Sequence, residues 1–131
     1  STASFDRLLA ISPSPANALT LCIGCFAEMG ADIVGLVERY GGRFPYVHVR
    51  DISGTVEDFI ETFPDDGQTD LIAVFRKLRD VGFDGYVRSD HAPQLASDDG
   101  DPDTPEGYGL QGHLFAMGYL RGLERASAPG R

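Results

Sequence analysis

Three alternations of a short apolar run with a longer amphipathic run constrain the fold of this chain more than any other feature. The apolar runs have the length of β-strands and cover 18–22, 44–49 and 85–87. A pattern of helical spacing follows each of them, over 33–40, 71–81 and 109–125. Strands that alternate with helices in this way are typical of parallel β/α units. The sequence therefore predicts an α/β fold.

Capping and breaking residues place the ends of these elements. Asp32 and Asp70 precede two of the helices and have side chains typical of N-caps. Gly41 and Gly82 are expected to end the same two helices. The other segments are expected to be a short helix over 5–11, a loop between 22 and 32, a long loop over 53–69 or a short helix around 56–63, an exposed loop over 93–107 and a disordered tail over 126–131.

Three strands make a thin parallel sheet, which needs helices on both faces or closure into a barrel. A (β/α)8 barrel typically takes about 250 residues, whereas this chain has 131. Residues 1–131 are therefore interpreted as a single partial domain, the C-terminal portion of a (β/α)8 TIM barrel. The chain does not begin with Met, which we take as a sign of processing, engineering or excision from a longer protein.

Charge and composition exclude several classes of partner. The net charge of -9 argues against nucleic acid and anionic membranes, because both require a basic face. No apolar run approaches the roughly 20 residues that span a bilayer, and the N-terminus lacks the pattern of a signal peptide. Two cysteines do not make a disulfide scaffold, so the reducing cytoplasm is the expected location.

The two cysteines, Cys22 and Cys25, form a C-x-x-C pair. Such a pair is typical of a thioredoxin-like redox motif or of half a zinc site. A zinc knuckle needs a second Cys/His pair nearby, and the sequence has none. A redox motif should open a helix after a strand, and the glycines at 24 and 30 leave this open as one possibility.

Metal-ligating side chains follow all three predicted strands. Cys22 ends the first strand, His48 the second and Asp90 the third. Each alone also fits a plain structural role, as a small buried residue, a core histidine or a turn. The carboxyl ends of parallel strands meet at one edge of a sheet and carry the active site in α/β folds. A thiolate, an imidazole and a carboxylate together suit Mn, Fe or Zn, so the pattern predicts a metal site there.

Further polar residues lie close to these three in the sequence. His91 follows Asp90, and a histidine beside a metal suits the activation of a small oxygenated substrate. Arg50 has the geometry to bind a substrate carboxylate, or alternatively forms a salt bridge to Asp51 or Glu61. Tyr108 precedes the last helix, where it either leans over the site or packs as an ordinary aromatic side chain.

Several short motifs occur in a specific order along nearly the whole chain: SPSPANALTLCIG at 12–24, YVHVRD at 46–51, FIE at 59–61, DG at 66–67 with an aspartate at 70, RSDH at 88–91, and GY at 107–108 leading to GYLRG at 118–122. This ordered set resembles the C-terminal part of mannonate dehydratase, a metal-dependent enzyme of the xylose-isomerase-like barrel group. The resemblance implies Mn2+ or Fe2+ as the cofactor, bound by Cys22, His48 and Asp90. The family's fourth ligand, a histidine from an earlier strand, has no counterpart upstream in this chain.

The resemblance also implies a reaction. D-mannonate would lose water to give 2-keto-3-deoxy-D-gluconate, a step of hexuronate and glucuronate catabolism, with His91 and Tyr108 as the acid/base pair. Arg50, Asn17 and His113 are the expected contacts to this small sugar acid, and a homo-oligomer that needs the missing N-terminal part is the expected assembly. The alternatives are a sugar isomerase or epimerase on the same barrel, or a non-catalytic fragment that only assembles with other chains.

Three positions depart from the family pattern. Ser89 stands where the family usually has proline, and His113 stands where arginine is expected. Cys25 stands where serine or threonine is usual, so it is not expected to be a metal ligand.

Overall fold

The computed structural model describes residues 3–96 and 104–128. Its helices are α1 (Ala3–Ala10), α2 (Ile23–Glu28), α3 (Ile33–Tyr40), α4 (Leu71–Asp80) and α5 (Leu110–Ser127), with a short 3-10 helix, η1 (Gly41–Arg43). Its strands are β1 (Thr20–Cys22), β2 (Tyr46–His48), β3 (Asp51–Thr55), β4 (Asp58–Thr62) and β5 (Tyr86–Arg88). No helix among the described residues is long and apolar enough to cross a membrane.

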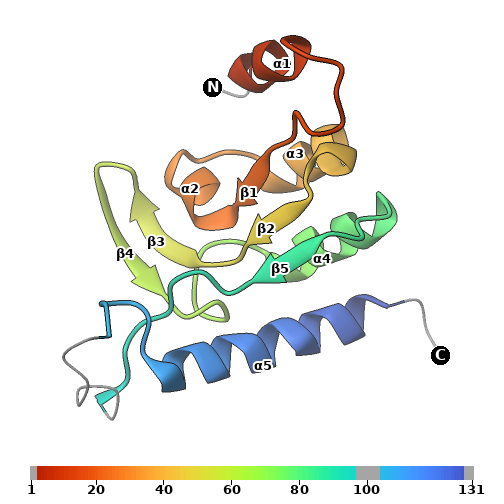
Figure 1. The fold of residues 1–131 in the computed structure, drawn as a ribbon. Coiled ribbons are helices and arrows are strands. Elements are labelled where there is room, and N and C mark those ends of the chain that lie inside the picture. Colours follow the sequence, from red (N-terminus) through yellow and green to blue (C-terminus); the bar gives the residue numbers. More distant parts are fainter. Residues whose placement is uncertain (1–2, 97–103, 129–131) are drawn as a thin grey trace.

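The predicted strands form one parallel sheet in the order β1-β2-β5. Their register pairs Cys22 with His48, and His48 with Arg88. The carboxyl ends of the three strands therefore lie side by side at one edge of the sheet. In Figure 1 the sheet lies between α1, beyond β1, and α5, beyond β5.

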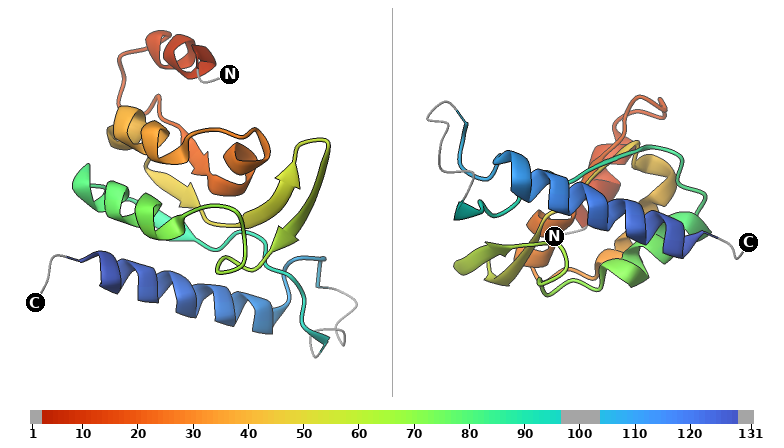
Figure 2. Two further views of the ribbon diagram at one scale, coloured as in Figure 1. Left: turned by 180° about the vertical axis from the view of Figure 1, so that it is seen from behind. Right: turned by 90° about the horizontal axis from the view of Figure 1, so that it is seen from below.

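Helices α3 and α4 cover one face of this sheet, as the view from behind shows (Figure 2). The predicted N-caps are confirmed: Asp32 accepts from the Gly35 N–H, and Asp70 accepts from the Ala73 N–H, each at 2.9 Å. The core between the sheet and these helices consists of fully or almost fully buried aliphatic side chains, among them Leu21, Val47, Leu36, Val37, Val74 and Leu78. Burying each such side chain stabilises the fold by about 1.5–3 kcal/mol.

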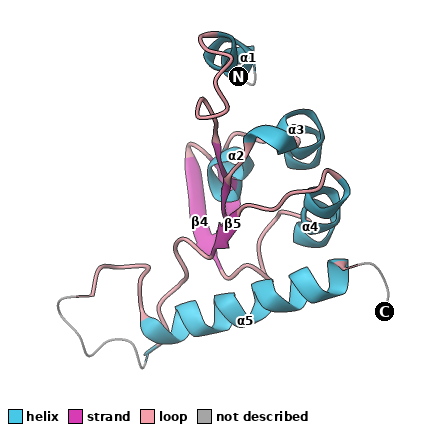
Figure 3. Ribbon diagram, turned by 45° about the vertical axis from the view of Figure 1, so that its right-hand side comes forward, coloured by secondary structure: helices cyan, strands magenta, loops and turns pink. Residues whose placement is uncertain are grey.

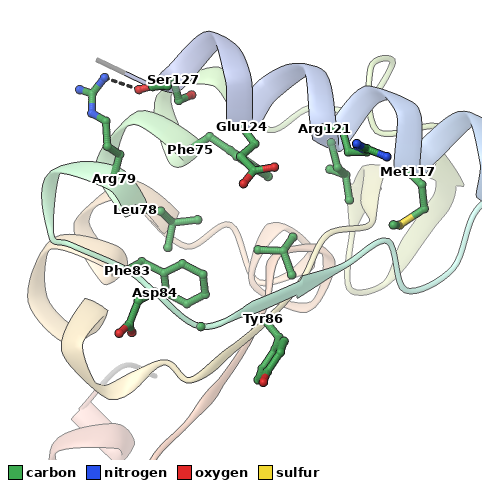
Figure 4. Close-up of a pocket in the computed structure, with 14 residues that line it drawn as sticks. Phe75, Leu78, Arg79, Phe83, Asp84, Tyr86, Met117, Arg121, Glu124 and Ser127 are labelled. Atoms are coloured by element: carbon green, nitrogen blue, oxygen red, sulfur yellow. Dashed lines mark hydrogen bonds between the residues drawn. The ribbon is translucent and has the colours of Figure 1, made fainter. Parts of the chain in front are cut away.

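The opposite face of the sheet is less covered. The outward residues of the three strands include Thr20 and Tyr86, which are exposed, and Tyr46, which is half-buried. Tyr86 is 79% exposed, an unusual fraction for an aromatic residue on a strand. A second opening lies between α4, α5 and β5, where a groove of about 580 Å³ is lined by apolar residues such as Phe75, Leu78 and Met117 (Figure 4).

The segment after β2 contradicts the prediction of a loop or helix over 53–62, whereas 63–69 is a loop as predicted. It forms an antiparallel hairpin in which Asp51 of β3 pairs with Thr62 of β4, and the hairpin lies beyond the carboxyl ends of the parallel strands (Figure 1). The segment is rich in β-branched residues, which favour a pleated conformation. Gly54 adopts a φ of +123° beside the backbone of Asp58, where a Cβ would collide with that residue's carbonyl oxygen.

Two further boundaries differ from the prediction. The segment expected as a loop after Cys22 contains α2, a helix too short to give a periodic pattern. Helix α5 continues to Ser127, so the first two residues of the predicted tail are helical; residues 129–131 lie outside the described residues. The Arg79 guanidinium donates to the Ser127 carbonyl at 2.5 Å, which holds this end of the helix against α4 (Figures 3 and 4).

Candidate functional site

The structure brings Cys22, His48 and Asp90 together at the carboxyl edge of the sheet. One ligand atom from each lies within 4.8 Å of the others. Asp90 Oδ2 is 3.6 Å from His48 Nδ1 and 3.8 Å from Cys22 Sγ. Cys22 and His48 end adjacent strands, and Asp90 follows β5 by two residues.

Asp90 has a left-handed backbone conformation. Its φ of +55° is the only positive value among the described non-glycine residues. The left-handed conformation costs an L-residue roughly 1–2 kcal/mol, although aspartate tolerates it better than most. The turn directs a largely buried carboxylate toward Cys22 and His48, and such strain is concentrated at functional sites.

These three side chains fit a divalent transition metal. Protein ligands lie about 2.0–2.3 Å from such an ion, so two ligands of one ion are roughly 3–4 Å apart. The separations of Asp90 from His48 and from Cys22, 3.6 and 3.8 Å, meet this condition, and all three ligand atoms lie within 4.8 Å of one another. Sulfur, nitrogen and oxygen donors suit Mn, Fe and Zn, and three protein ligands leave coordination positions free for a substrate.

Burial raises the pKa of the Cys22 thiol to about 11, although the Cys25 N–H and the Arg50 charge act in the opposite direction. Without a cation the thiol therefore keeps its proton at neutral pH. A coordinated metal ion reverses this, because a thiol that binds a divalent cation is deprotonated.

A buried guanidinium lies beside these ligands. Arg50 Nη2 donates to Glu28 Oε1 at 2.5 Å and to Cys25 Sγ at 3.5 Å, and its Nε is 3.7 Å from Asp90 Oδ2. Nη1 is 3.2 Å from Glu61 Oε1 but outside hydrogen-bond geometry, so it has no hydrogen-bond partner among the described residues. Of the two alternative ion pairs predicted for Arg50, the structure contains the one with Glu61.

The other alternative partner, Asp51, is engaged elsewhere. Its carboxylate is fully buried and accepts from the Thr69 N–H and hydroxyl, at 2.9 and 2.8 Å, and from the Ile52 N–H at 2.8 Å. It therefore holds the start of the hairpin against the segment that leads into α4.

Packing and charge fix the position of Arg50. A Cβ on Gly24 of α2 would lie 2.6 Å from Arg50 Cγ, so glycine is needed where the helix crosses this side chain. Burial would lower the pKa of Arg50, but the hydrogen bond to Glu28 and the neighbouring Cys22 and Cys25 raise it above its usual value. The guanidinium is therefore a permanent positive charge within the site.

The remaining predicted residues form an aromatic cluster next to Arg50. His91 Nδ1 lies 3.0 Å from Glu61 Oε1, and the His91 ring meets Tyr108 edge-on at 5.1 Å between centroids. Tyr108 stacks on His113 at 5.5 Å. His113 Nδ1 shares a hydrogen bond with the Ser89 hydroxyl at 2.9 Å, while its buried Nε2 has no partner among the described residues.

Asn17 is the one predicted site residue that lies apart from the others. It precedes β1, at the opposite end of that strand from Cys22. Its side-chain amide donates to the carbonyls of Leu8, Leu9 and Ser12, at 3.0 to 3.2 Å. The structure thus gives Asn17 the role of closing the C-terminal end of α1.

Comparison with known proteins shows the family to which the chain belongs. The family model described as D-mannonate dehydratase (UxuA) matches residues 1–129. The chain belongs to the D-mannonate dehydratase family. The predicted family resemblance is therefore confirmed, and so is the α/β fold with parallel strands.

Individual members of the family show how much of it the chain represents. It is 37% identical over 125 residues to the mannonate dehydratase of Bacillus subtilis, which covers 92% of this chain and 34% of that protein. With the mannonate dehydratase of Lactococcus lactis subsp. cremoris it shares 36% over 132 residues, covering 92% and 35%. The crystal structure of mannonate dehydratase from Streptococcus suis serotype2 superposes with a TM-score of 0.86 and 27% identity, covering 96% of this chain and 37% of that chain. The chain thus spans about a third of the length of the relatives it matches.

Two carboxylates of this family member were not predicted as site residues. Glu28 ends α2 and binds Arg50, while Glu61 of β4 contacts both Arg50 and His91. The family motif FIE contained Glu61, but without the hairpin nothing in the sequence placed it beside His91. For Glu28 we find no sequence signal, because its partner depends on how α2 packs.

Proposed function

We propose that this chain is the C-terminal part of a D-mannonate dehydratase, a carbon-oxygen lyase that removes water from D-mannonate to give 2-keto-3-deoxy-D-gluconate. The observation that carries the proposal is the convergence of Cys22, His48 and Asp90 within 4.8 Å, in a chain of this family. These residues would hold Mn2+ or Fe2+. When bound, the ion would act as a Lewis acid on the substrate oxygens and stabilise the negative charge that develops during the reaction.

Arg50 is suited to bind the carboxylate of the sugar acid. Its Nη1 is buried, has no hydrogen-bond partner among the described residues and belongs to a group that stays charged. Because Nη2 is engaged by Glu28, Nη1 would donate a single charge-assisted hydrogen bond to the substrate carboxylate, in place of its ion pair with Glu61. The unpartnered Nε2 of His113 is a further candidate contact for a substrate hydroxyl. We do not assign such a role to Asn17, whose amide is occupied by backbone carbonyls.

We assign the two proton transfers to His91 and Tyr108. One must take the weakly acidic proton from C2 and the other must protonate the C3 hydroxyl, which leaves as water. The resulting enol then becomes the 2-keto product. Glu61 lies at Nδ1 of His91, so it orients the ring and leaves Nε2 free for the substrate side. The edge-on contact with Tyr108 keeps the two proton-transfer groups adjacent.

We also propose that residues 1–131 form part of a (β/α)8 barrel. The outer strands β1 and β5 each pair with a single strand among the described residues, which leaves two sheet edges open. The sheet face opposite α3 and α4 carries exposed residues such as Tyr86, as expected if it lines a barrel. The groove beside β5, which is lined by apolar side chains together with charged ones such as Arg121 and Glu124, offers space for a further element of a barrel (Figure 4). We place the enzyme in the cytoplasm as a homo-oligomer, in keeping with its two free cysteines and exposed apolar residues.

The metal site can be tested on the chain itself. EDTA-treated protein is melted with and without Mn2+, alongside Cys22→Ala and the matched control Cys25→Ala. At about 100 times its dissociation constant, a ligand of the folded state adds about 2.7 kcal/mol, which raises Tm by roughly 10 °C for a chain of this size. We expect this rise in the wild type and in Cys25→Ala but not in Cys22→Ala. Equal responses of the two variants would contradict the proposed ligand set.

The reaction is tested after the chain is combined with the segment of a relative that completes the family fold. Formation of a 2-keto acid from D-mannonate, lost in His91→Asn and Tyr108→Phe, would support the dehydratase. Isomerisation or epimerisation without loss of water would contradict it and favour the alternative chemistry on the same barrel.

A further inference from the structure

The second cysteine of the C-x-x-C pair has no role in the proposed reaction. Cys22 is the N-cap of α2, and Cys25 is the third residue of this helix. Side chains three positions apart at a helix start lie on the same side. In agreement, the Cys25 thiol and N–H are both close enough to affect the pKa of Cys22. The two sulfur atoms are therefore neighbours, and one of them belongs to the metal site.

The surroundings make Cys25 the accessible member of the pair. Cys25 is exposed, whereas Cys22 is half-buried. Arg50 Nη2 donates to Cys25 Sγ at 3.5 Å, so a hydrogen bond holds that sulfur in place at the start of α2. An oxidant in solution should therefore react first with Cys25, which leaves Cys22 as the neighbouring thiol that can form the disulfide.

We propose that Cys22 and Cys25 form a reversible disulfide on exposure to hydrogen peroxide, and that the disulfide releases the metal ion by withdrawing Cys22 from it. The second half of this inference rests on the proposed function, because it requires Cys22 to be a ligand. The first half depends only on the position of the two thiols.

The chemistry balances with peroxide as the oxidant. The Cys25 sulfur attacks one peroxide oxygen, the O–O bond breaks, and a sulfenic acid and one water result. The Cys22 sulfur then attacks the Cys25 sulfur, the S–S bond forms and the oxygen leaves as a second water. The two thiols lose two electrons and two protons in total, and peroxide accepts them. A dithiol reductant reverses the reaction by thiol–disulfide exchange.

The disulfide has a direct consequence for the cluster. Its Cβ atoms must come to about 3.5–4.5 Å, so the Cys22 sulfur turns toward α2 and away from Asp90. His48 and Asp90 then remain as two ligands, and a disulfide sulfur has no thiolate charge to offer. We therefore expect oxidation to abolish binding of the ion.

The test uses metal-free and Mn2+-loaded chain, each with Cys25→Ser as the matched control. In metal-free wild type we expect peroxide to remove both free thiols, to give a mass lower by two hydrogens, and dithiothreitol to restore both. Cys25→Ser should retain the Cys22 ligand but form no intramolecular disulfide. If peroxide produces only sulfinic or intermolecular products in the wild type, the inference is wrong.

The Mn2+-loaded chain tests whether the disulfide releases the metal ion. We expect peroxide to release Mn2+ from the wild type, dithiothreitol to allow rebinding, and Cys25→Ser to keep its ion under the same treatment. Release that is equal in both proteins would overturn the switch. Failure of the reduced chain to bind Mn2+ would contradict the proposed metal site, while disulfide formation in the metal-free chain would still support the pairing of the thiols.

Discussion

Replacing Arg50 by methionine should strongly destabilise the chain. The side chain of Arg50 is 9% exposed and lies within ion-pair distance of three carboxylates, of which those of Glu28 and Asp90 are only 14% and 11% exposed. Methionine retains most of the volume, so the loss is chiefly electrostatic. Removing one partner of a buried ion pair typically costs about 3–5 kcal/mol.

The lower end of this range is the appropriate expectation. Glu61, the third carboxylate, is 31% exposed, so water compensates part of its lost interaction. We therefore expect the free energy of unfolding of Arg50→Met to fall by about 3 kcal/mol. Removing the negative charge of Glu28 at the same time should recover about 1–2 kcal/mol, because one buried charge is then no longer unpaired.

Urea unfolding of metal-free chain, followed by circular dichroism at neutral pH, measures these differences. Arg39→Met is the matched control, since Arg39 also binds a carboxylate, that of Asp6, but is 62% exposed. This control should change stability by no more than about 1 kcal/mol. If Arg50→Met and Arg39→Met were equally stable, Arg50 would not be the charge that holds α2, β4 and Asp90 together.

Three further predictions concern single neighbours of the site. Burial raises the pKa of Cys22 from 9.0 to about 11, so between these pH values the metal-free folded chain keeps a proton that the unfolded chain releases. The free energy of unfolding of the wild type should therefore fall as the pH rises from 9 to 11. Urea titrations should show a smaller fall in Cys22→Ser. Gly24→Ala should lower the free energy of unfolding by about 2 kcal/mol, because the added Cβ would collide with the side chain of Arg50. Gly118→Ala should raise it by about 0.5–1 kcal/mol, because a Cβ there meets open space on α5. The reverse order of stability in urea unfolding would refute this reasoning. Glu61→Leu should reduce the fraction of His91 protonated at Nδ1, measured by 15N NMR, and an unchanged ratio would show that the carboxylate does not select the tautomer.

The parts of the fold that were predictable are those in which local sequence and tertiary packing agree. Asp32 and Asp70 cap their helices as expected, because an N-cap needs only its own side chain and the next few backbone amides. The strand positions followed from apolar runs that end in a polar residue. In a parallel sheet, this periodicity alone brings Cys22, His48 and Asp90 to one edge.

The parts that were not predictable depend on contacts between distant residues. The β3–β4 hairpin lacks a clear alternation of apolar and polar residues, since both strands are largely exposed. Its stability depends partly on Asp51, whose partner Thr69 lies 18 positions along the chain. Asn17 was predicted to contact the substrate because it lies in a family motif. In the structure its amide instead binds backbone carbonyls at the C-terminal end of α1, a contact that the sequence did not indicate.

The origin of the site residues separates metal binding from catalysis. Two of the proposed ligands end adjacent strands and the third, Asp90, follows the next strand of the same sheet by two residues; Arg50, which pairs with Asp90, follows β2. If these three residues are the ligands, we expect ion binding to need none of the strands that would complete the proposed barrel. The proposed turnover would differ, because the exposed sheet face and the groove beside β5 would leave a substrate open to water. The chain alone should bind Mn2+ through Cys22 but turn over D-mannonate only when the remaining strands are supplied. That result would show that this chain contributes the metal ligands and that the remaining strands enclose the site. Full turnover by the chain alone would show instead that enclosure is not needed.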